Sequence, residues 1–559
     1  MLNNYYNSVK QKTWSLKHIE ERKVNKIVQD LQISDFLARI ICTRDIAIDE
    51  VEDFIEPSLK KNLPSPLLIK DMAIAVERIS KAFINKEKIA IFGDYDVDGA
   101  TSSAVLYKSF KKFGIEPTIY IPDRQKEGYG PNEKALKSLK DKGISLVITV
   151  DCGITAFNEL DYAKKINLDI IVVDHHVPEA KLPYALALVN PNRIDDATNL
   201  GMLAAVGVSF MLVGALKNKL INIGFIKKEN SINLSSILDL VALGTVCDVV
   251  PLVGPNRAFV KHGLKVMSKR QNTGINALFE ISNVEDFPNV FHAGFVLGPR
   301  INAGGRVGES DLGAKLLTTD DINYAKKISI HLNILNEERK KLESDVLEES
   351  KKMAENYDDN SILVLSGKNW HPGVIGIVAS RIVEQYNKPT IIIAKNGDNS
   401  KGSGRSISGI DIGSIITTAK QSGILENGGG HPMACGLTIN EDKINDLRLF
   451  INQKNADQNN KIKKTYLVDM AISVSGAIPE LIKQLRLIEP FGAGNPEPKF
   501  IIKDVNLFNA KIVGENHIKC SISDSTNSRL DAIAFRSVGT VLGKSLLNNY
   551  HAHVIGRLK

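Results

Sequence analysis

Residues 89–99 read Ile89-Ala90-Ile91-Phe92-Gly93-Asp94-Tyr95-Asp96-Val97-Asp98-Gly99, an apolar run followed by three carboxylates at every second position. The run predicts a buried parallel strand, and an extended chain with this spacing would aim all three acids to one side. Three carboxylates that close repel one another unless a cation compensates them, and a divalent metal with oxygen ligands is the simplest such cation. Taken alone, the stretch fits an acidic Asx-turn about equally well.

Three further apolar runs end on a carboxylate or an imidazole, and they favour the metal site. Open α/β sheets bind ligands outside the carboxyl ends of their strands, so these ends are expected to converge. A lone Asp or His is more often structural than a ligand, but four such ends are hard to explain in that way. The runs are Ser145–Val150 before Asp151, Leu168–Val173 before Asp174-His175-His176, and Leu238–Cys247 (a helix or a strand) before Asp248.

The expected ligands supply mostly oxygen donors together with one imidazole. This mixture suits Mn²⁺ or Mg²⁺ better than structural zinc, which prefers more Cys and His. The residues that we expect to gather around the metal are Asp94, Asp96, Asp98, Asp151, His175 and Asp248.

The ordered motifs resemble those of the DHH phosphoesterase superfamily, which is named for the triad seen here as Asp174-His175-His176. Downstream, Gly428-Gly429-Gly430-His431 is similar to the signature of the DHH-associated domain. Within the superfamily, the chain is most similar to the single-strand-specific 5′→3′ exonucleases of DNA repair and recombination. That similarity rests on the GDYDVDG form of the first motif and on Gly244–Leu252, Arg300–Arg306, Trp370–Gly376, Ser403–Arg405 and Glu489–Pro496.

The resemblance implies two divalent cations, Mn²⁺ or Mg²⁺, which hydrolyse a phosphodiester without a protein nucleophile. By this resemblance Asp96 and Asp98 each serve one ion and Asp151 bridges the two. The rest of the implied metal shell consists of His175 and Asp248, with Asp94 at its edge.

Further catalytic roles follow from the same resemblance. Asp174 would orient an imidazole, and His176 would face the scissile phosphate. Gly429 and Gly430 would let the backbone approach an anion closely, and His431 would add positive charge where the transition state needs it. A flexible glycine turn would be the simpler interpretation of this motif outside its context.

Arginine and serine side chains are expected to bind phosphate groups of the substrate, because guanidinium groups grip phosphate bidentately. By resemblance, Arg124, Ser403 and Arg405 would hold a 5′-terminal phosphate and thereby fix the polarity. We expect Arg300, Asn302 and Arg306 to line the same phosphate channel.

Strands that alternate with helical stretches predict an α/β fold with a parallel sheet. A long amphipathic helix should join this DHH phosphoesterase domain to a second α/β unit, the DHH-associated domain. The β-rich end is consistent with an OB-type barrel. Because relatives usually continue with a further strand-forming segment, this barrel is expected to be either short of a strand or closed differently. The expected division is 1–75 helical, 76–310 catalytic, 311–358 connecting helix, 359–455 DHH-associated and 465–559 OB-type, with a linker at 454–464.

The composition is compatible with a nucleic-acid enzyme and does not demand one. The 559 residues carry 71 Lys plus Arg against 64 Asp plus Glu, a mild excess that permits a polyanionic partner. Five scattered cysteines without a CxxC pair fit a cytoplasmic, reducing compartment. No apolar run is long enough to call for a membrane, and nothing in the sequence demands more than a monomer.

Single-stranded DNA is thus the expected substrate, and a RecQ-type helicase and a single-stranded-DNA-binding protein are the candidate partners. One alternative is a DHH-type phosphodiesterase that acts on short oligonucleotides or nucleoside bisphosphates, although such relatives are generally shorter and lack the C-terminal barrel. Another is an inactive binding module, but the chain retains every expected metal ligand.

Overall fold

The computed structural model describes residues 6–9, 13–124, 126–357, 362–457, 465–548 and 551–559. Its first large unit is built on a parallel sheet with the strand order β4-β3-β5-β6-β7. Every residue of β3 and β5 is buried, which explains why their sequences are almost wholly apolar. The strands are β3 (Ile89–Gly93), β4 (Thr118–Tyr120), β5 (Leu146–Val150), β6 (Asp169–Val173) and β7 (Ala187–Val189).

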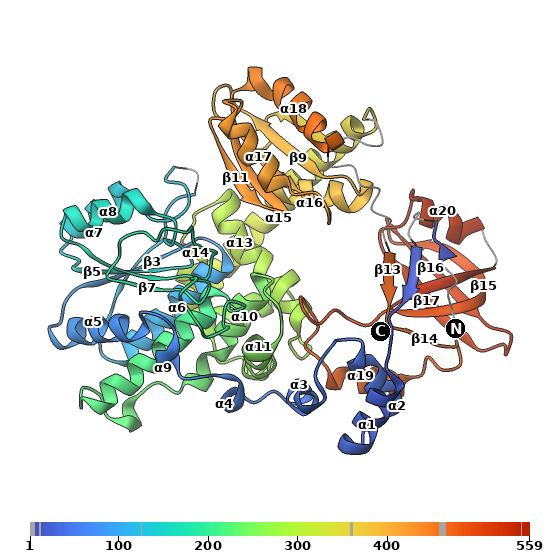
Figure 1. The fold of residues 1–559 in the computed structure, drawn as a ribbon, viewed down its shortest axis with the longest axis horizontal. Coiled ribbons are helices and arrows are strands. Elements are labelled where there is room, and N and C mark those ends of the chain that lie inside the picture. The colour runs from blue at the N-terminus through green and yellow to red at the C-terminus, as the bar shows by residue number, and fades with distance from the viewer. Residues whose placement is uncertain (1–5, 10–12, 125, 358–361, 458–464, 549–550) are drawn as a thin grey trace.

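Helices cover both faces of this sheet, as the βα alternation predicted (Figure 1). One face packs on the large core beneath α5 (Met72–Ile84), α6 (Val97–Lys112) and α9 (Ala205–Asn222). The other face packs on α7 (Glu133–Asp141) and α8 (Phe157–Lys165). A helical subdomain follows, with α10 (Leu238–Cys247), α11 (Gly254–Met267), α12 (Thr273–Ile281), the π-helix His292–Leu297, α13 (Gly298–Val307) and α14 (Leu312–Thr318).

The predicted connecting helix is present as α15 (Ile322–Ala354), and α14 occupies the beginning of the range expected for it. Beyond it, a second five-stranded sheet has the order β11-β12-β10-β9-β8. This DHH-associated unit lies above the rest of the molecule in Figure 1. Its elements are β8 (Leu363–Lys368), α16 (Ile375–Tyr386), β9 (Thr390–Lys395), β10 (Ser400–Arg405), α17 (Ile412–Gln421), β11 (Asn427–His431), β12 (Ala434–Ile439) and α18 (Ile444–Asp457).

The C-terminal strands confirm the OB-type class and form an open half-barrel. The long strand β15 pairs with β18 along its first half and with β16 along its second half, with a bulge in each pairing. These elements are β13 (Thr465–Val468), β14 (Met470–Ala471), α19 (Pro479–Leu487), β15 (Phe500–Val513), β16 (His517–Ser523), β17 (Arg529–Ala534), α20 (Val541–Asn548) and β18 (His551–Gly556).

The N-terminal segment differs from the purely helical one that the sequence predicts. Residues of β2 (Thr13–Leu16) pair in parallel with β13, so this segment completes a sheet with the far end of the chain. Its helices share a core with Leu485, Ile488 and Phe500. Strand β2 and the C-terminal end of the chain accordingly lie on the same side of Figure 1. The remaining N-terminal elements are β1 (Tyr6–Asn7), α1 (Glu21–Leu31), α2 (Asp35–Cys42), α3 (Val51–Ile55) and α4 (Leu59–Asn62).

Two sequence expectations concern segments that are only partly described. The expected linker at 454–464 has its first four residues in α18, and 458–464 lie outside the described residues. Within the described part of the chain, no helix is both long and apolar enough to cross a membrane.

Candidate metal centre and phosphate cavity

The backbone that carries the three aspartates of the first motif is not extended, as predicted, but passes from a strand into a helix. Strand β3 ends at Gly93, and Asp96 is already the N-cap of α6, where its Oδ1 accepts hydrogen bonds from the backbone N–H groups of Asp98 and Gly99 at 2.9 and 3.0 Å. Asp98 therefore lies in the first turn of a helix. A helix N-terminus carries partial positive charge, which favours carboxylates there.

The backbone of a second helix holds Asp98 in place. Both of its carboxylate oxygens accept hydrogen bonds from the first turn of α9, from the N–H of Ala205 at 2.7 Å and from that of Val206 at 2.9 Å. Gly244 of α10 fits against the same carboxylate, because a Cβ there would lie 3.0 Å from Oδ1 of Asp98. Three helices thus fix the orientation of one buried acid.

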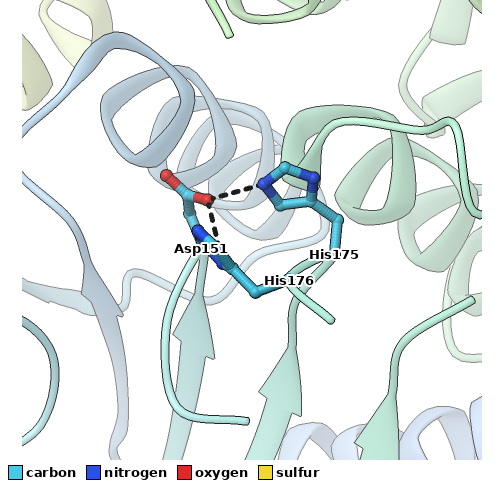
Figure 2. A group of neighbouring side chains, drawn as sticks. All are labelled: Asp151, His175 and His176. Carbon is cyan, nitrogen blue, oxygen red and sulfur yellow. Dashed lines mark ion pairs between the residues drawn. The ribbon is translucent and has the colours of Figure 1, made fainter. Parts of the chain in front are cut away.

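Asp151 and the DHH triad follow the neighbouring strands β5 and β6, and Figure 2 shows the two imidazoles beside the Asp151 carboxylate. Nε2 of His175 lies 3.3 Å from Oδ1 of Asp151, 3.6 Å from Oδ2 of Asp248 and 3.9 Å from Oδ2 of Asp98. Asp151 has a left-handed backbone, with φ of 60°, and its carbonyl accepts a 2.9 Å hydrogen bond from the Tyr129 hydroxyl. Parallel strands therefore do bring these ends together.

The donor atoms form groups that are compact enough to hold metal ions. One group contains Asp94, Asp96 and Asp151, and a second contains Asp98, His175 and Asp248. Asp151 also groups with the two imidazoles. Three of the buried donor atoms have no hydrogen-bond partner among the described residues, namely Oδ1 of Asp94, Nε2 of His175 and Oδ2 of Asp248. Buried polar atoms are rarely left unpaired, so these residues fit bound cations.

The pKa values report the same unbalanced charge. Burial, reinforced by the Asp96 charge, raises the pKa of Asp94 to about 8, and burial raises the pKa of Asp248 to about 7. Burial also raises the pKa values of Asp98 and Asp151 well above their usual range. The pKa of His175 falls to about 4, chiefly through burial, so its imidazole is neutral and available as a ligand.

His176 carries the opposite charge state. Burial disfavours its protonation, but the hydrogen bond from its Nδ1 to Oδ1 of Asp174, at 2.7 Å, together with the negative charges of Asp174 and of the neighbouring aspartates, raises the pKa of His176 to about 9. The same pairing lowers the pKa of Asp174 against the effect of burial. The ring is consequently an imidazolium at neutral pH.

Two asparagines that the sequence reading missed support this triad. Asn190 donates to the carbonyl of His176 at 2.8 Å, and Asn192 donates to the carbonyl of His175. Both belong to the Asn-Pro-Asn turn after β7, and an Asx-rich turn directly after an apolar run is the signal that would have found them.

A cavity of about 1070 Å³ opens between the two α/β units. Four of the predicted phosphate ligands line it, Arg124 and Arg306 from the first unit and Ser403 and Arg405 from strand β10 of the second. In the described chain, none of the three arginines has a carboxylate within ion-pair distance. Burial lowers the pKa values of Arg306 and Arg405, as expected for guanidinium groups kept away from water. The cavity thus offers convergent positive charge to an anion.

Two of the predicted channel residues do not line this cavity. Arg300 bonds instead to Oδ1 of Asn333 at 3.0 Å and to the carbonyl of Val296 at 2.8 Å. Oδ1 of Asn302 is buried and unpaired in the described structure, on the helix α13 that also carries Arg306. Tyr95, which the sequence reading did not single out, does line the cavity.

The glycine motif is a strand and not a turn. Residues 427–431 form β11, which pairs antiparallel with β12. At Gly430 a Cβ would lie 2.3 Å from the carbonyl oxygen of Ala434, so glycine is needed there for the close approach of β12. Gly429 faces open space, and the exposed His431 ends the strand outside the cavity lining. The glycines are therefore part of an extended strand, and a flexible turn, the simpler interpretation of the motif, is not what the structure has.

Family models match three successive parts of the chain. The DHH family N-terminal domain matches residues 88–245, the DHHA1 domain matches 359–457 and the RecJ OB domain matches 468–559. Together with the carboxylate cluster, this order defines a metal-dependent phosphoesterase of the DHH class.

Curated relatives identify the family. The chain is 35% identical to the single-stranded-DNA-specific exonuclease RecJ of Dickeya dadantii over 85% of each chain, and 34% identical to that of Escherichia coli over 87% of each. It is 34% identical to RecJ of Bacillus subtilis, over 93% of this chain but only 65% of that longer relative. The chain belongs to the RecJ family of the DHH superfamily.

Solved structures agree with this assignment. The structure of RecJ in complex with Mn²⁺ from Thermus thermophilus superposes with a TM-score of 0.82 at 27% identity, over 98% of this chain and 76% of that one. The structure of an exonuclease RecJ bound to manganese gives a TM-score of 0.60 at 32% identity, over 71% of this chain and 96% of that one. RecJ from Thermus thermophilus has also been solved in complex with Mg²⁺.

Proposed function

We propose that the protein degrades single-stranded DNA in the 5′→3′ direction, releases 5′-mononucleotides, and acts in DNA repair and recombination. The observation that carries this proposal is the set of buried, unpaired donor atoms at the ends of β3, β6 and α10, within a chain of the RecJ family. The short-oligonucleotide alternative gains no comparable support, because the half-barrel is retained.

Two Mn²⁺ or Mg²⁺ ions fit the two ligand groups. Asp94, Asp96 and Asp151 would hold one ion, Asp98, His175 and Asp248 would hold the other, and Asp151 would lie at the boundary between them. When bound, such a pair activates water and stabilises the charge that develops on the phosphate oxygens.

The chain's own residues supply the remaining chemistry. Asp174 holds the Nδ1 proton of His176, and the imidazolium provides positive charge next to the carboxylate cluster, 4.0 Å from Oδ1 of Asp151. We assign His176 to the scissile phosphate, where its remaining N–H donates to an oxygen as negative charge develops. His431, Gly429 and Gly430 would approach the same phosphate from β11, and Arg300 and Asn302 would line the path of the strand.

The cavity between the two α/β units would determine the 5′→3′ direction of degradation. Arg124, Arg306, Ser403 and Arg405 line this cavity together, and among the described residues none of the three arginines has a carboxylate within ion-pair distance. A 5′-terminal phosphate is the anion that a 5′→3′ enzyme must recognise. Arg405→Ala should therefore reduce the rate on 5′-phosphorylated strands more than on 5′-hydroxyl strands. Equal, wild-type rates on both strands in this variant would refute the anchor.

The half-barrel supports binding of the rest of the strand. On its sheet Lys511 faces Lys519, the Arg529 guanidinium lies 5.4 Å from the centre of the Phe508 ring, and Phe535 is exposed. Basic groups interleaved with aromatic rings suit single-stranded nucleic acid. We further propose that the domains have the boundaries given above and that the protein is a monomer. A cytoplasmic location is proposed because the five cysteines form no disulfide. A RecQ-type helicase and a single-stranded-DNA-binding protein would supply the substrate.

A time course on 5′-labelled single-stranded DNA with Mn²⁺ tests the proposal. We expect early release of labelled mononucleotide, slow loss of a 3′ label, an intact duplex control, and no activity in Asp151→Asn. Intact long strands with rapid cleavage of short oligonucleotides or nucleoside bisphosphates would instead place the protein among the small-substrate phosphodiesterases.

A further inference from the structure

Tyr95 belongs to the metal-binding loop and to the phosphate cavity at once. In the sequence it stands between Asp94 and Asp96, whose carboxylates group with that of Asp151. Its side chain nevertheless lines the cavity together with Arg124 and Arg306. Among the described residues, no other one that lines this cavity is a direct sequence neighbour of a carboxylate in the metal groups.

One face of the Tyr95 side chain is held by a glycine of α13. A Cβ on Gly305 would lie 2.3 Å from Cδ2 of Tyr95 and 2.8 Å from its Cγ. Real Cβ atoms do not approach other atoms that closely, so only glycine lets the ring lie against this helix. The ring position is therefore fixed by the backbone of the helix that also carries Arg306.

The Arg124 guanidinium lies over the Tyr95 ring, with its Cζ 4.7 Å from the ring centre. This distance is within the range of a cation–π interaction. Among the described residues, no carboxylate lies within ion-pair distance of Arg124, and the neighbouring Arg306 repels it. The aromatic face is thus a direct attractive contact for the Arg124 guanidinium, and the Asp94 carboxylate attracts it from beyond ion-pair distance.

We propose that Tyr95 is a positioning residue that sets the specificity for a 5′-phosphorylated end by holding Arg124 over its ring. The inference rests on the proposed function, in which Arg124 binds the terminal phosphate. Because Tyr95 adjoins two metal ligands, the same side chain fixes the phosphate anchor relative to the metal groups. A flexible guanidinium would lose entropy on binding phosphate, and the ring removes part of that cost in advance.

The test compares Tyr95→Leu and Tyr95→Phe with the wild type on one oligonucleotide, carrying either a 5′-phosphate or a 5′-hydroxyl. Tyr184→Leu is the matched control, since this half-exposed tyrosine lies 3.8 Å from Nζ of Lys164 and outside the cavity lining. The measured quantity is the ratio of kcat/KM for the phosphorylated strand to that for the hydroxyl strand. The rise in Tm on adding Mn²⁺ reports separately on the metal loop.

We expect Tyr95→Leu to lower this ratio about fivefold to tenfold, while Tyr95→Phe and Tyr184→Leu stay within about twofold of the wild type. Retained stabilisation by Mn²⁺ would show that the metal groups are intact in Tyr95→Leu. Equal losses on both strands would overturn the inference and leave Tyr95 a purely structural role. A loss in Tyr95→Phe as large as that in Tyr95→Leu would overturn it too, by assigning the effect to the hydroxyl. A wild type without preference for 5′-phosphate would instead refute the anchor itself.

Discussion

In the metal centre, burial and pairing with a carboxylate have opposite effects on the pKa of a histidine side chain. Burial lowers the pKa of His175 to about 4, whereas His176, which alone of the two hydrogen-bonds to the Asp174 carboxylate, has a pKa raised to about 9. Adjacent imidazoles therefore have opposite tasks, one as a neutral ligand and one as a cation. This contrast makes Asp174 the residue whose removal is most informative.

Asp174→Asn should move the alkaline limb of the kcat profile to lower pH. Without the carboxylate, burial of the charged ring is uncompensated, and the pKa of His176 falls toward or below its ordinary value. The loss of kcat should then be about tenfold greater at pH 8 than at pH 6. Kinetics at saturating Mg²⁺ across this range measure it, with Asp195→Asn, which breaks a pair with Arg193 elsewhere, as the control. An unmoved limb would contradict the role of His176.

Stability of the metal-free protein should fall as pH rises through neutrality. The folded-state pKa values of Asp94 and Asp248, about 8 and 7, lie above their unfolded values near 4, so the folded state binds more protons between these limits. The contribution to stability is full below about pH 4 and is lost as pH rises toward 8.

Thermal melts in EDTA should therefore show Tm lower by several degrees at pH 8 than at pH 6. Added Mn²⁺ should remove most of that difference, because bound cations compensate the ionised carboxylates. The double variant Asp94→Asn/Asp248→Asn should flatten the profile. A metal-free Tm that rises over this interval would contradict the burial of ionised acids.

At the scale of helices and strands, the close packing of α10 against its neighbouring helices determines the position of the metal ligand Asp98. Gly244 and Gly263 both let α10 approach a neighbouring helix, but only Gly244 touches a metal ligand. A Cβ on Gly244 would lie 2.3 Å from Oγ1 of Thr101 and 3.0 Å from Oδ1 of Asp98. A Cβ on Gly263 would lie 2.2 Å from the carbonyl oxygen of Leu238, away from the site.

Each glycine-to-alanine change should lower the free energy of unfolding by about 1–3 kcal/mol through overpacking. Gly244→Ala should in addition weaken Mn²⁺ binding about tenfold, since it displaces the Asp98 carboxylate, whereas Gly263→Ala should leave Mn²⁺ binding unchanged. Denaturant melts and Mn²⁺ titrations separate the two effects. Equal metal affinity in both variants would show that Asp98 does not depend on this crossing.

At the scale of the whole molecule, one buried arginine joins the catalytic unit to the N-terminal segment and to the C-terminal unit. Arg257 of α11 donates to the carbonyl of Phe54 at 2.6 Å and to those of Ile488, Glu489 and Pro490 at 2.9–3.2 Å. Its hydrogen-bond acceptors among the described residues are all backbone oxygens, and its Cζ lies 3.9 Å from the centre of the Phe54 ring. Burial lowers the pKa of Arg257 to about 10. Removal of this side chain would leave buried acceptors without donors.

Arg257→Met should cost about 3–5 kcal/mol and loosen the C-terminal unit from the catalytic one. Limited proteolysis should then release a C-terminal fragment early, and degradation of long strands should suffer more than cleavage of short oligonucleotides. Arg270→Met is the control, since the Arg270 guanidinium lies over the Phe279 ring and donates to the Val284 carbonyl, which both belong to the catalytic unit. Identical proteolysis of wild type and Arg257→Met would refute the clamp.

Much of the fold was readable in advance because its strands are apolar runs that end on polar residues. The alternation of strands and helical stretches predicted the parallel sheet with helices between its strands, and the long amphipathic pattern predicted α15. Convergence of Asp151 and His175 also followed, since parallel strands present their carboxyl ends at one edge. The extended-chain argument for Asp96 and Asp98 was wrong, because a helix begins between Asp94 and Asp98.

The sequence by itself determined the class of site: oxygen-rich donors at four element ends, followed by the motifs of a DHH-associated unit and an OB-type unit. Only the tertiary structure decided that β2 pairs with β13, that Arg257 bonds to the carbonyl of Ile488, and that Tyr95 links the phosphate cavity to the metal loop. The physical reason is the separation along the chain of the residues that are in contact. Strand ends are ordered by local chain chemistry, whereas cavities and clamps depend on contacts between segments hundreds of residues apart.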